Sequence, residues 1–152
     1  MLATRTIYLA TDHAGFAHKE AVRDWLLAEG VAVVDVGASI YDEGDDFPDY
    51  ISKAGVAVSQ NPQTSVAIIF GGSGQGEAMV ANRFKGVRAT VYYGGDESII
   101  SLSREHNDAN VLSIGARFVS IEQTKKVIWD WLHMDKGTDP KYQRRNLKID
   151  AR

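Results

Sequence analysis

The chain has 152 residues, which at roughly 100–200 residues per domain predicts a single domain covering residues 1–152. Hydrophobic residues make up 44% of the sequence, a fraction typical of a folded globular protein and too high for a disordered chain. Seventeen basic against twenty acidic side chains leave a formal net charge of −3. This balance argues against nucleic acid or an acidic membrane surface as a partner.

Cysteine is absent, which excludes disulfides, thiolate nucleophiles and metal sites built on sulfur, and permits a reducing compartment. No apolar run approaches the ~20 residues of a membrane span. Residues 1–5 lack the apolar core of a signal peptide. The sequence therefore predicts a soluble, cytoplasmic protein.

Short apolar runs rich in β-branched residues predict five strands buried on both faces, over residues 6–10, 31–36, 66–70, 87–92 and 111–114. Amphipathic stretches alternate with these runs and predict helices over residues 19–29, 50–60, 77–84, 96–106 and 121–133. A last helix is expected from Pro140 to the C-terminus, because the fixed φ of proline suits a first helical turn.

The strict alternation of strand and helix predicts right-handed crossovers and an α/β sandwich, with five parallel strands and helices on both faces. In open parallel sheets, ligands bind beyond the carboxyl ends of the strands. The segments that follow the predicted strands are residues 11–15, 37–39, 71–77, 93–96 and 115–117. We therefore expect a functional site to be built from these segments.

Residues 71–76 contain four glycines, so successive backbone N–H groups can face a phosphate or an oxyanion. Glu77 stands where a nucleoside-triphosphate loop needs lysine, and Gln75 stands where a nucleophilic serine elbow needs glycine. A dinucleotide fingerprint would place its third glycine one residue later and would follow the first strand. A tight turn without a ligand is the alternative interpretation.

Glu77 lies in the first turn of the helix that follows this loop. A carboxylate there can simply complement the helix dipole, an arrangement worth about 0.3–1 kcal/mol. A carboxylate beside an oxyanion-binding loop can also abstract a proton next to a carbonyl. Both readings are open from the residues alone.

Histidine titrates near neutrality, so His13 after the first strand and His106 at the end of the fourth helix are candidate proton carriers. His106 can instead be a cation that complements a helix C-terminus. His18 and His133 are predicted to be surface residues. No two histidines have the helical spacing of metal ligands, and the acidic loop 37–49 lacks a calcium-binding pattern, so we expect no metal site.

Arginine binds phosphate through planar, bidentate contacts, so Arg117, Arg144 and Arg145 are candidate phosphate ligands. A solvated surface position is the alternative for each of them.

Five segments together carry a resemblance to a known family: residues 12–15, 46–50, 71–77 with 81–83, 104–108 and 115–117. In order and spacing they resemble the type B ribose-5-phosphate isomerases, a family that also contains galactose-6-phosphate and allose-6-phosphate isomerases. The resemblance covers nearly all of the chain. It implies a Rossmann-like α/β/α sandwich and a homodimer or homotetramer with shared active sites, the C-terminal helix reaching a neighbouring subunit. It implies no metal and no organic cofactor.

The resemblance also implies roles for individual residues. Glu77 is the expected base that moves a proton between C2 and C1 of the open-chain sugar; some members use a cysteine at the position of Gly71. The remaining roles are enediolate stabilisation by Ser73 and the amides of Gly72, Gly74 and Gly76; ring opening by Asp12 and His106; hydroxyl binding by Asn107; and phosphate binding by His13, Arg117 and Arg145.

One departure from the family concerns substrate choice. Lys141-Tyr142 stands where the family usually has Arg-His; lysine keeps the charge that binds phosphate but loses the bidentate fork. We expect an isomerase that interconverts ribose 5-phosphate and ribulose 5-phosphate. The alternatives are an isomerase of erythrose 4-phosphate, allose 6-phosphate or galactose 6-phosphate, a non-enzymatic phosphate-binding module on a flavodoxin-like sheet, and a hydrolase that uses Ser73.

Overall fold

In this computed structural model, residues 4–152 are described, and a central parallel sheet organises them. The five strands found there run in the order β2-β1-β3-β5-β4, and every neighbouring pair is parallel. Their bounds are Thr6–Thr11 for β1, Val33–Asp35 for β2, Ser65–Gly71 for β3, Ala89–Tyr92 for β4 and Val111–Gly115 for β5. The expected five-stranded parallel sheet is confirmed.

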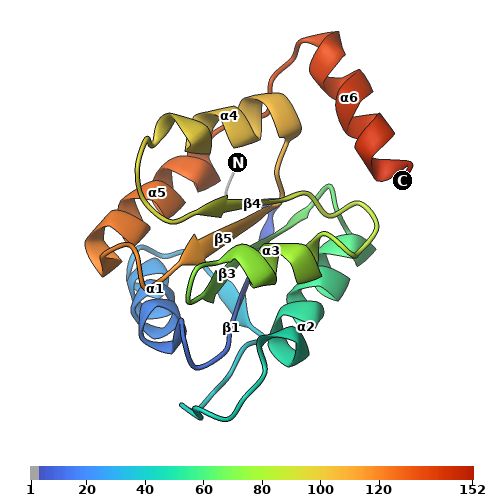
Figure 1. Cartoon of the computed structure of the whole chain (residues 1–152). Helices are drawn as coiled ribbons and strands as arrows, with labels where there is room; N and C mark the ends of the chain where they lie inside the picture. The colour runs from blue at the N-terminus through green and yellow to red at the C-terminus, as the bar shows by residue number, and fades with distance from the viewer. Residues whose placement is uncertain (1–3) are drawn as a thin grey trace.

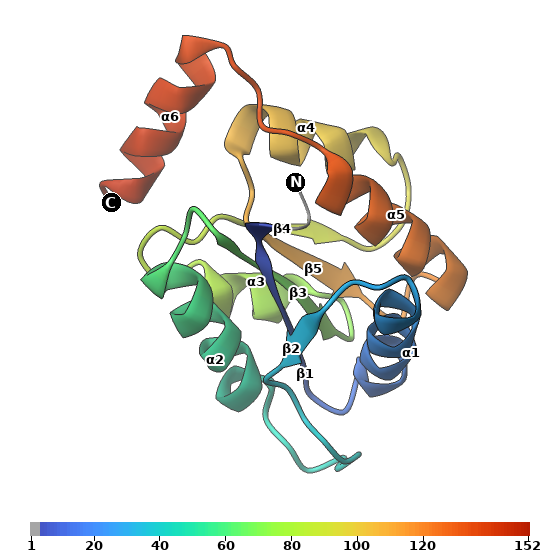
Figure 2. The same cartoon turned by 180° about the vertical axis from the view of Figure 1, so that it is seen from behind.

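Helices cover both faces of the sheet (Figures 1 and 2). Their bounds are Phe16–Ala28 for α1, Phe47–Gln60 for α2, Gln75–Ala81 for α3, Ser98–Asn107 for α4, Ile121–His133 for α5 and Pro140–Asp150 for α6. Side chains of α1, α4 and α5 pack in one apolar core with β1, β3 and β5, and side chains of α2 and α3 form a second core on the other face. The layers are therefore α/β/α.

The central strands are buried because most of their residues are apolar; Ser65 in β3 and Ser113 in β5 are the polar exceptions. All seven residues of β3 and all five of β5 are buried, which is the pattern of parallel strands covered on both faces. None of the described helices is both long and apolar enough to cross a membrane. Residues 1–3, part of the segment tested for a signal peptide, lie outside the described residues.

The two edge strands are shorter and more exposed than the apolar pattern predicts. The prediction of burial on both faces is wrong for β2, whose residues are half-buried or exposed, and for most of β4. At the start of the predicted second strand, the amide of Val31 bonds to Leu26 O at the end of α1 instead of joining the sheet. An edge strand pairs on one side only, so local turns replace its ends.

The predicted helix bounds were approximate, except for α5, which matches residue by residue. Ser120 caps α5 by accepting a hydrogen bond from the amide of Gln123, 3.1 Å away. The prediction placed the starts of α1 and α2 three residues too late and ended α3 at residue 84 instead of Ala81. Residues 82–87 instead form turns, which carry the chain to β4.

Helix α6 lies outside the two helix layers that cover the sheet. It packs beside α4, away from the sheet (Figures 1 and 2). Asp139 caps it by accepting from the amide of Lys141 at 2.9 Å, and Pro140 occupies its first turn. Leu147 and Ile149 on this helix are 69% and 48% exposed. Its apolar residues therefore have little cover within one chain.

Candidate functional site

The glycine-rich loop leads from the end of β3 into α3. Gly74 is the N-cap of α3 and has φ +78°, a left-handed conformation that favours glycine. The Ser113 hydroxyl donates to Gly74 O at 2.7 Å, and the Arg117 amide donates to Gly72 O at 3.0 Å, so β5 and its following turn hold the loop. Within residues 4–152, the amides of Gly72, Ser73 and Gly74 have no acceptor. These donors are free to bind an anion.

Glu77 lies buried beside this loop, with only 4% of its surface exposed. Its carboxylate occupies the space above Gly71, where an added Cβ would overlap the carboxylate atoms. Burial is the main cause that raises the pKa of Glu77, and the nearby Asp12 raises it further. The pKa is lowered by a hydrogen bond to its own backbone and by Arg117. A buried carboxylate with a raised pKa is suited to general-base chemistry.

Asp12 and His13 follow β1 at the same edge of the sheet. Asp12 is 5% exposed, and its Oδ1 accepts a hydrogen bond from the amide of Ala14 at 3.0 Å. The Nδ1 of His13 lies 2.6 Å from Asp45 Oδ1 and 3.7 Å from Asp12 Oδ2. The hydrogen bond with Asp45 is the main cause that raises the pKa of His13.

Arg117 follows β5 and completes this group. Its side chain is exposed, and its guanidinium lies against Gly72, where an added Cβ would be 3.0 Å from Nη1. The structure thus brings together the residues expected after β1, β3 and β5, which we call the loop cluster: Asp12, His13, Gly72, Ser73, Gly74, Gly76, Glu77 and Arg117. This agrees with the rule that ligands bind beyond the carboxyl ends of parallel strands.

Four other predicted site residues do not belong to the loop cluster: His106, Asn107, Lys141 and Arg145. His106 and Asn107 end α4 just before β5 begins, and α6 packs beside α4. The end of α4 and the neighbouring helix α6 therefore lie toward the amino ends of the strands, opposite the loop cluster (Figure 1). We call the four residues that these helices carry the helix cluster. One copy of the chain does not bring the two clusters together.

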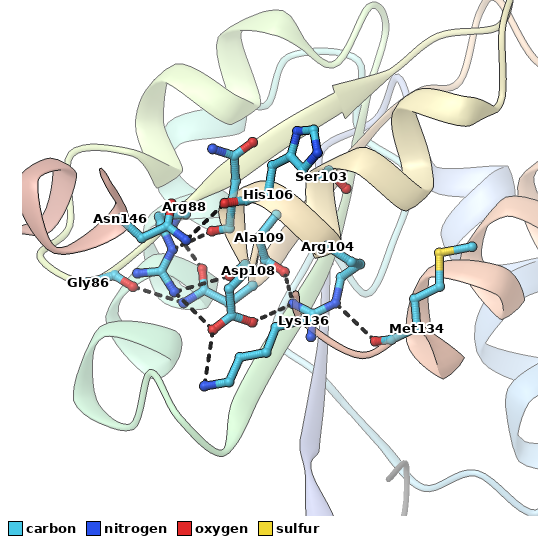
Figure 3. Close-up of polar contacts among 12 residues, drawn as sticks. Gly86, Arg88, Ser103, Arg104, His106, Asp108, Ala109, Met134, Lys136 and Asn146 are labelled. Atoms are coloured by element: carbon cyan, nitrogen blue, oxygen red, sulfur yellow. Dashed lines mark hydrogen bonds and ion pairs between the residues drawn. The ribbon is translucent and has the colours of Figure 1, made fainter. Parts of the chain in front are cut away.

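A half-buried polar network supports the helix cluster (Figure 3). Arg88 donates to both carboxylate oxygens of Asp150 at 2.9 and 2.8 Å, and to the carbonyl oxygens of Asn107 and Asp108 at 2.8 and 3.1 Å. Asn146 donates to His106 O at 3.1 Å. These bonds join α6 to the end of α4 and hold the backbone of His106 and Asn107.

Asp108 forms the turn after α4. It is the one non-glycine residue with positive φ (+43°) in the described chain, and its carboxylate accepts from Arg104 at 2.9 Å. Arg104 is itself 1% exposed and donates to Ala109 O at 2.6 Å and to Met134 O at 3.3 Å. Figure 3 shows Asp108 between Arg104 and Lys136. Buried charge pairing thus sets the turn that presents His106 and Asn107.

A cleft of about 1050 Å³ opens between α6 and the segment that joins α3 to β4. Its lining includes Arg83, Arg88, Asn107, Arg145 and Lys148. The loop cluster does not line this cleft. The cleft is rich in basic side chains, so it suits an acidic or phosphorylated group.

Lys141 and Tyr142 differ in their surroundings. Lys141 Nζ lies 3.0 Å from Asp139 Oδ2, and this pairing is the main cause that raises the pKa of Lys141. The ring of Tyr142 stacks on His106 with centroids 4.4 Å apart. Tyr142 therefore contacts a predicted site residue directly.

Asp12, His13 and Asp45 form the one group among the described residues that could hold a metal ion, with ligand atoms within 4.8 Å of one another. The Nδ1 of His13 already shares a hydrogen bond with Asp45. A metal at that nitrogen would have to displace the shared proton.

The sequence analysis missed three residues with polar roles near the clusters: Lys19, Asp45 and Arg88. Lys19 is fully buried in α1 and pairs with Glu20 and Asp35 at 2.9 and 2.5 Å. The acidic character of loop 37–49 was a signal for Asp45, but its partner lies 32 residues away. No local pattern distinguishes Lys19 or Arg88 from surface cations.

Comparisons with known proteins show the family of this chain. The profile of the family described as Ribose/Galactose Isomerase matches residues 7–149. A probable ribose-5-phosphate isomerase B of Mycoplasma genitalium is 34% identical over 143 residues, 94% of this chain and 92% of that protein. Ribose-5-phosphate isomerase B of Escherichia coli K12 is 36% identical over 128 residues, 84% of this chain and 83% of that protein.

Solved structures give the same result. A crystal structure of ribose-5-phosphate isomerase B from Mycoplasma genitalium with bound ribulose-5-phosphate superposes with TM-score 0.91 and 32% identity, covering 97% of this chain and 95% of that one. A ribose 5-phosphate isomerase structure from Thermotoga maritima superposes with TM-score 0.88 and 32% identity, covering 97% of this chain and 99% of that one. The chain belongs to the ribose/galactose isomerase family.

Proposed function

We propose that this protein is an aldose–ketose isomerase that interconverts ribose 5-phosphate and ribulose 5-phosphate through an enediolate. The observation that carries the proposal is the buried Glu77 carboxylate beside a loop with free backbone donors. Relatives that bear the name ribose-5-phosphate isomerase B, one of them solved with ribulose-5-phosphate, support this substrate. The proposal treats residues 1–152 as a single domain acting in the cytoplasm, which the lack of cysteine permits.

Glu77 is the proposed base. Its carboxylate takes the proton from C2 of the open-chain aldose, which leaves an enediolate. The hydroxyl proton of O2 passes to O1, and the Glu77 carboxyl group returns its proton to C1, so that C1 becomes the alcohol and C2 the carbonyl of the ketose. The reverse transfer converts ketose to aldose. Burial supports this role, because it raises the pKa of Glu77 and so strengthens the carboxylate as a base.

Ser73 and the amides of the glycine loop are proposed to stabilise the negative oxygen of the enediolate. The free amides of Gly72, Ser73 and Gly74 support this role, since fixed donors stabilise charge that develops during a reaction. We assign ring opening to Asp12 with His106, and binding of sugar hydroxyls to Asn107. No metal or organic cofactor is needed for this proton transfer.

The phosphate is proposed to bind His13 and Arg117 of one subunit together with Arg145, and Lys141, of a second copy. The separation of the loop cluster and the helix cluster within one chain supports a site shared between two copies. Exposed Leu147 and Ile149 on α6 and the open basic cleft beside this helix also support such an assembly. A homodimer is the smallest assembly that meets this requirement, and a tetramer made of two such dimers meets it equally.

The substrate assignment is tested by a coupled assay on ribose 5-phosphate, erythrose 4-phosphate, allose 6-phosphate and galactose 6-phosphate. We expect the largest kcat/KM on ribose 5-phosphate. A larger kcat/KM on another sugar phosphate would change the assigned substrate but keep the assignment as an aldose–ketose isomerase. Lys141 and Tyr142 would then be the first positions to examine. Absence of turnover on all four would favour a non-enzymatic phosphate-binding module.

A hydrolase that uses Ser73 has less support. Ser73 is exposed, and its hydroxyl oxygen accepts a hydrogen bond from the Gln75 amide at 3.4 Å. Within residues 4–152, no histidine lies in hydrogen-bond contact with it. Turnover by Ser73→Ala above about a tenth of the wild-type rate would exclude a nucleophilic serine, since removal of a catalytic nucleophile costs far more.

A further inference from the structure

Asp45 binds His13 through two hydrogen bonds to the same oxygen. Asp45 Oδ1 accepts from the His13 amide at 3.1 Å and lies 2.6 Å from the imidazole Nδ1. In the described part of the chain, the imidazole Nε2 has no hydrogen-bond partner. One ring nitrogen is therefore engaged and the other is available to a ligand.

The loop that carries Asp45, residues 36–46, is held in place at several points. Near its start, the buried Lys19 ammonium donates to Ala38 O at 2.7 Å. In its middle, the ring of Tyr41 packs edge-on against the His13 ring, with centroids 6.2 Å apart. Just beyond its end, the Phe47 ring lies against Gly76 of the glycine loop. Asp45 is thus presented by a segment anchored on both sides.

The carboxylate of Asp45 is nearly removed from solvent. Its side chain is 6% exposed, and its second oxygen, Oδ2, is buried without a hydrogen-bond partner among the described residues. A buried carboxylate with one unpaired oxygen is unfavourable unless a cation compensates its charge. The imidazolium form of His13 is the cation in contact with it.

We propose that Asp45 is a positioning residue for His13, which holds the imidazole through Nδ1 so that Nε2–H is the donor to the phosphate of the sugar phosphate. This inference rests on the proposed function, which assigns His13 to the phosphate. A hydrogen bond at one ring nitrogen sets both the tautomer and the orientation of the ring. The imidazolium also separates the Asp45 carboxylate from the bound anion.

The charges around His13 favour its protonated form. Asp45 raises its pKa through the hydrogen bond, and Asp12 raises it through charge, whereas burial and Arg117 lower it. Tyr41 contributes a ring edge and no charge near neutral pH. Because the pKa is raised above 6.5, the positive charge persists as pH rises through 6.5 and is lost only above the raised value.

Asp45→Asn tests the inference, because asparagine keeps the shape and one acceptor oxygen but removes the charge. Asp42→Asn is the matched control: it makes the same charge change on the same loop and keeps the acceptor for the Gly44 amide, 2.9 Å away. For Asp45→Asn we expect KM for ribose 5-phosphate to stay within about twofold of wild type at pH 6 and to rise about fivefold or more at pH 8. We expect kcat within about twofold of wild type throughout, and an unchanged KM profile for Asp42→Asn.

A second measurement follows the histidine itself, independently of turnover. The ¹⁵N NMR signals of His13, assigned by comparison with His13→Gln, should titrate at lower pH in Asp45→Asn than in wild type. Inorganic phosphate should shift the Nε2 signal of wild type, and more weakly that of Asp45→Asn at pH 8. Equal titration midpoints in the two proteins would overturn the inference.

The kinetic result separates this inference from the proposed function. An active wild type together with an Asp45→Asn variant whose KM matches wild type at every pH refutes the role of Asp45 and leaves the isomerase assignment intact. A uniform fall of kcat at all pH values would show a structural role instead and would also overturn the inference. A wild type inactive on every sugar phosphate refutes the proposed function, while the phosphate shift at Nε2 still tests Asp45.

Discussion

The imidazole of His106 stacks on the phenol ring of Tyr142, with the ring planes inclined by 27° and the centroids 4.4 Å apart. The contact joins the end of α4 to the start of α6, next to the hydrogen bond from Asn146 to His106 O. Position 142 thus acts on the orientation of His106, a different role from that of a phosphate-binding cation.

The Tyr142 stack predicts a measurable effect on turnover. Tyr142→Ala should lower kcat/KM about two- to tenfold, because an aromatic pair contributes about 0.5–1.5 kcal/mol beyond its buried area. Tyr142→Phe keeps the stacked ring and should stay within about twofold of wild type. Steady-state kinetics on ribose 5-phosphate checks both. Wild-type activity of Tyr142→Ala would show that the stack does not orient His106 for the reaction.

Glu77→Gln should keep the fold and lower kcat by at least ~10²-fold, the usual range for loss of a general base. The amide is nearly isosteric with the carboxylate but cannot accept the proton from carbon. For wild type, kcat/KM should fall on the acid side, with its midpoint above 4.5 because burial raises the pKa of Glu77. Near wild-type turnover of a folded Gln variant would remove Glu77 from the mechanism.

The same raised pKa has a consequence for stability. A carboxyl group whose pKa is higher in the folded than in the unfolded state destabilises the fold when it is ionised, so the penalty is present at neutral pH and disappears as pH falls below the unfolded value. The Glu77→Gln variant should therefore unfold at the same or higher temperature than wild type at pH 7. Thermal unfolding followed by circular dichroism at pH 7 and pH 4 measures this difference.

Gly71→Ala should also impair catalysis, because a Cβ at this position would overlap the Glu77 carboxylate and displace it. We expect a loss of kcat of about tenfold or more, since misplacement of a reacting group by about 1 Å can cost ~10²-fold. The control is Gly44→Ala, because Gly44 lies on an exposed turn. Gly95→Ala is unsuitable as a control, because Gly95 has a positive φ that alanine rarely adopts. Unimpaired turnover by a folded Gly71→Ala protein would mean that the carboxylate can relocate without loss.

A shared site predicts complementation between two inactive variants. In a mixed dimer of Glu77→Gln and Arg145→Ala, one of the two sites keeps both residues, so random exchange should restore about a quarter of wild-type activity. Mixing Glu77→Gln with His13→Ala is the matched control, since both residues belong to the loop cluster and every mixed site stays defective. Full activity of a monomer, shown by light scattering at assay concentration, would refute the shared site.

Activity should survive exhaustive dialysis against EDTA, because the proposed proton transfer uses protein groups alone. The residues that could hold a metal ion are Asp12, His13 and Asp45, because their ligand atoms lie within 4.8 Å of one another. If EDTA abolished turnover and a divalent cation restored it, this group would become the candidate metal site. Asp45→Asn would then weaken metal binding, which calorimetry measures directly.

The sequence by itself determined the layers of this fold and the place of the glycine loop. The mostly apolar composition of β3 and β5 and the amphipathic pattern of α5 are local properties, and the structure has these elements close to where the pattern places them. The edge strand β2 was predicted too long, because apolar residues there indicate burial that a strand with one neighbour does not provide.

Tertiary structure alone decided which polar groups meet. Asp45 and His13 are 32 residues apart, and Arg88 and Asp150 are 62 residues apart, so no periodicity links either pair. His106 and Glu77 both flank central strands in the sequence. His106 precedes β5 and Glu77 follows β3, so the first lies toward the amino ends and the second toward the carboxyl ends of the parallel strands. Local sequence patterns indicate the burial and periodicity of a segment. The order and direction in which the chain passes through the sheet decide which side chains become neighbours.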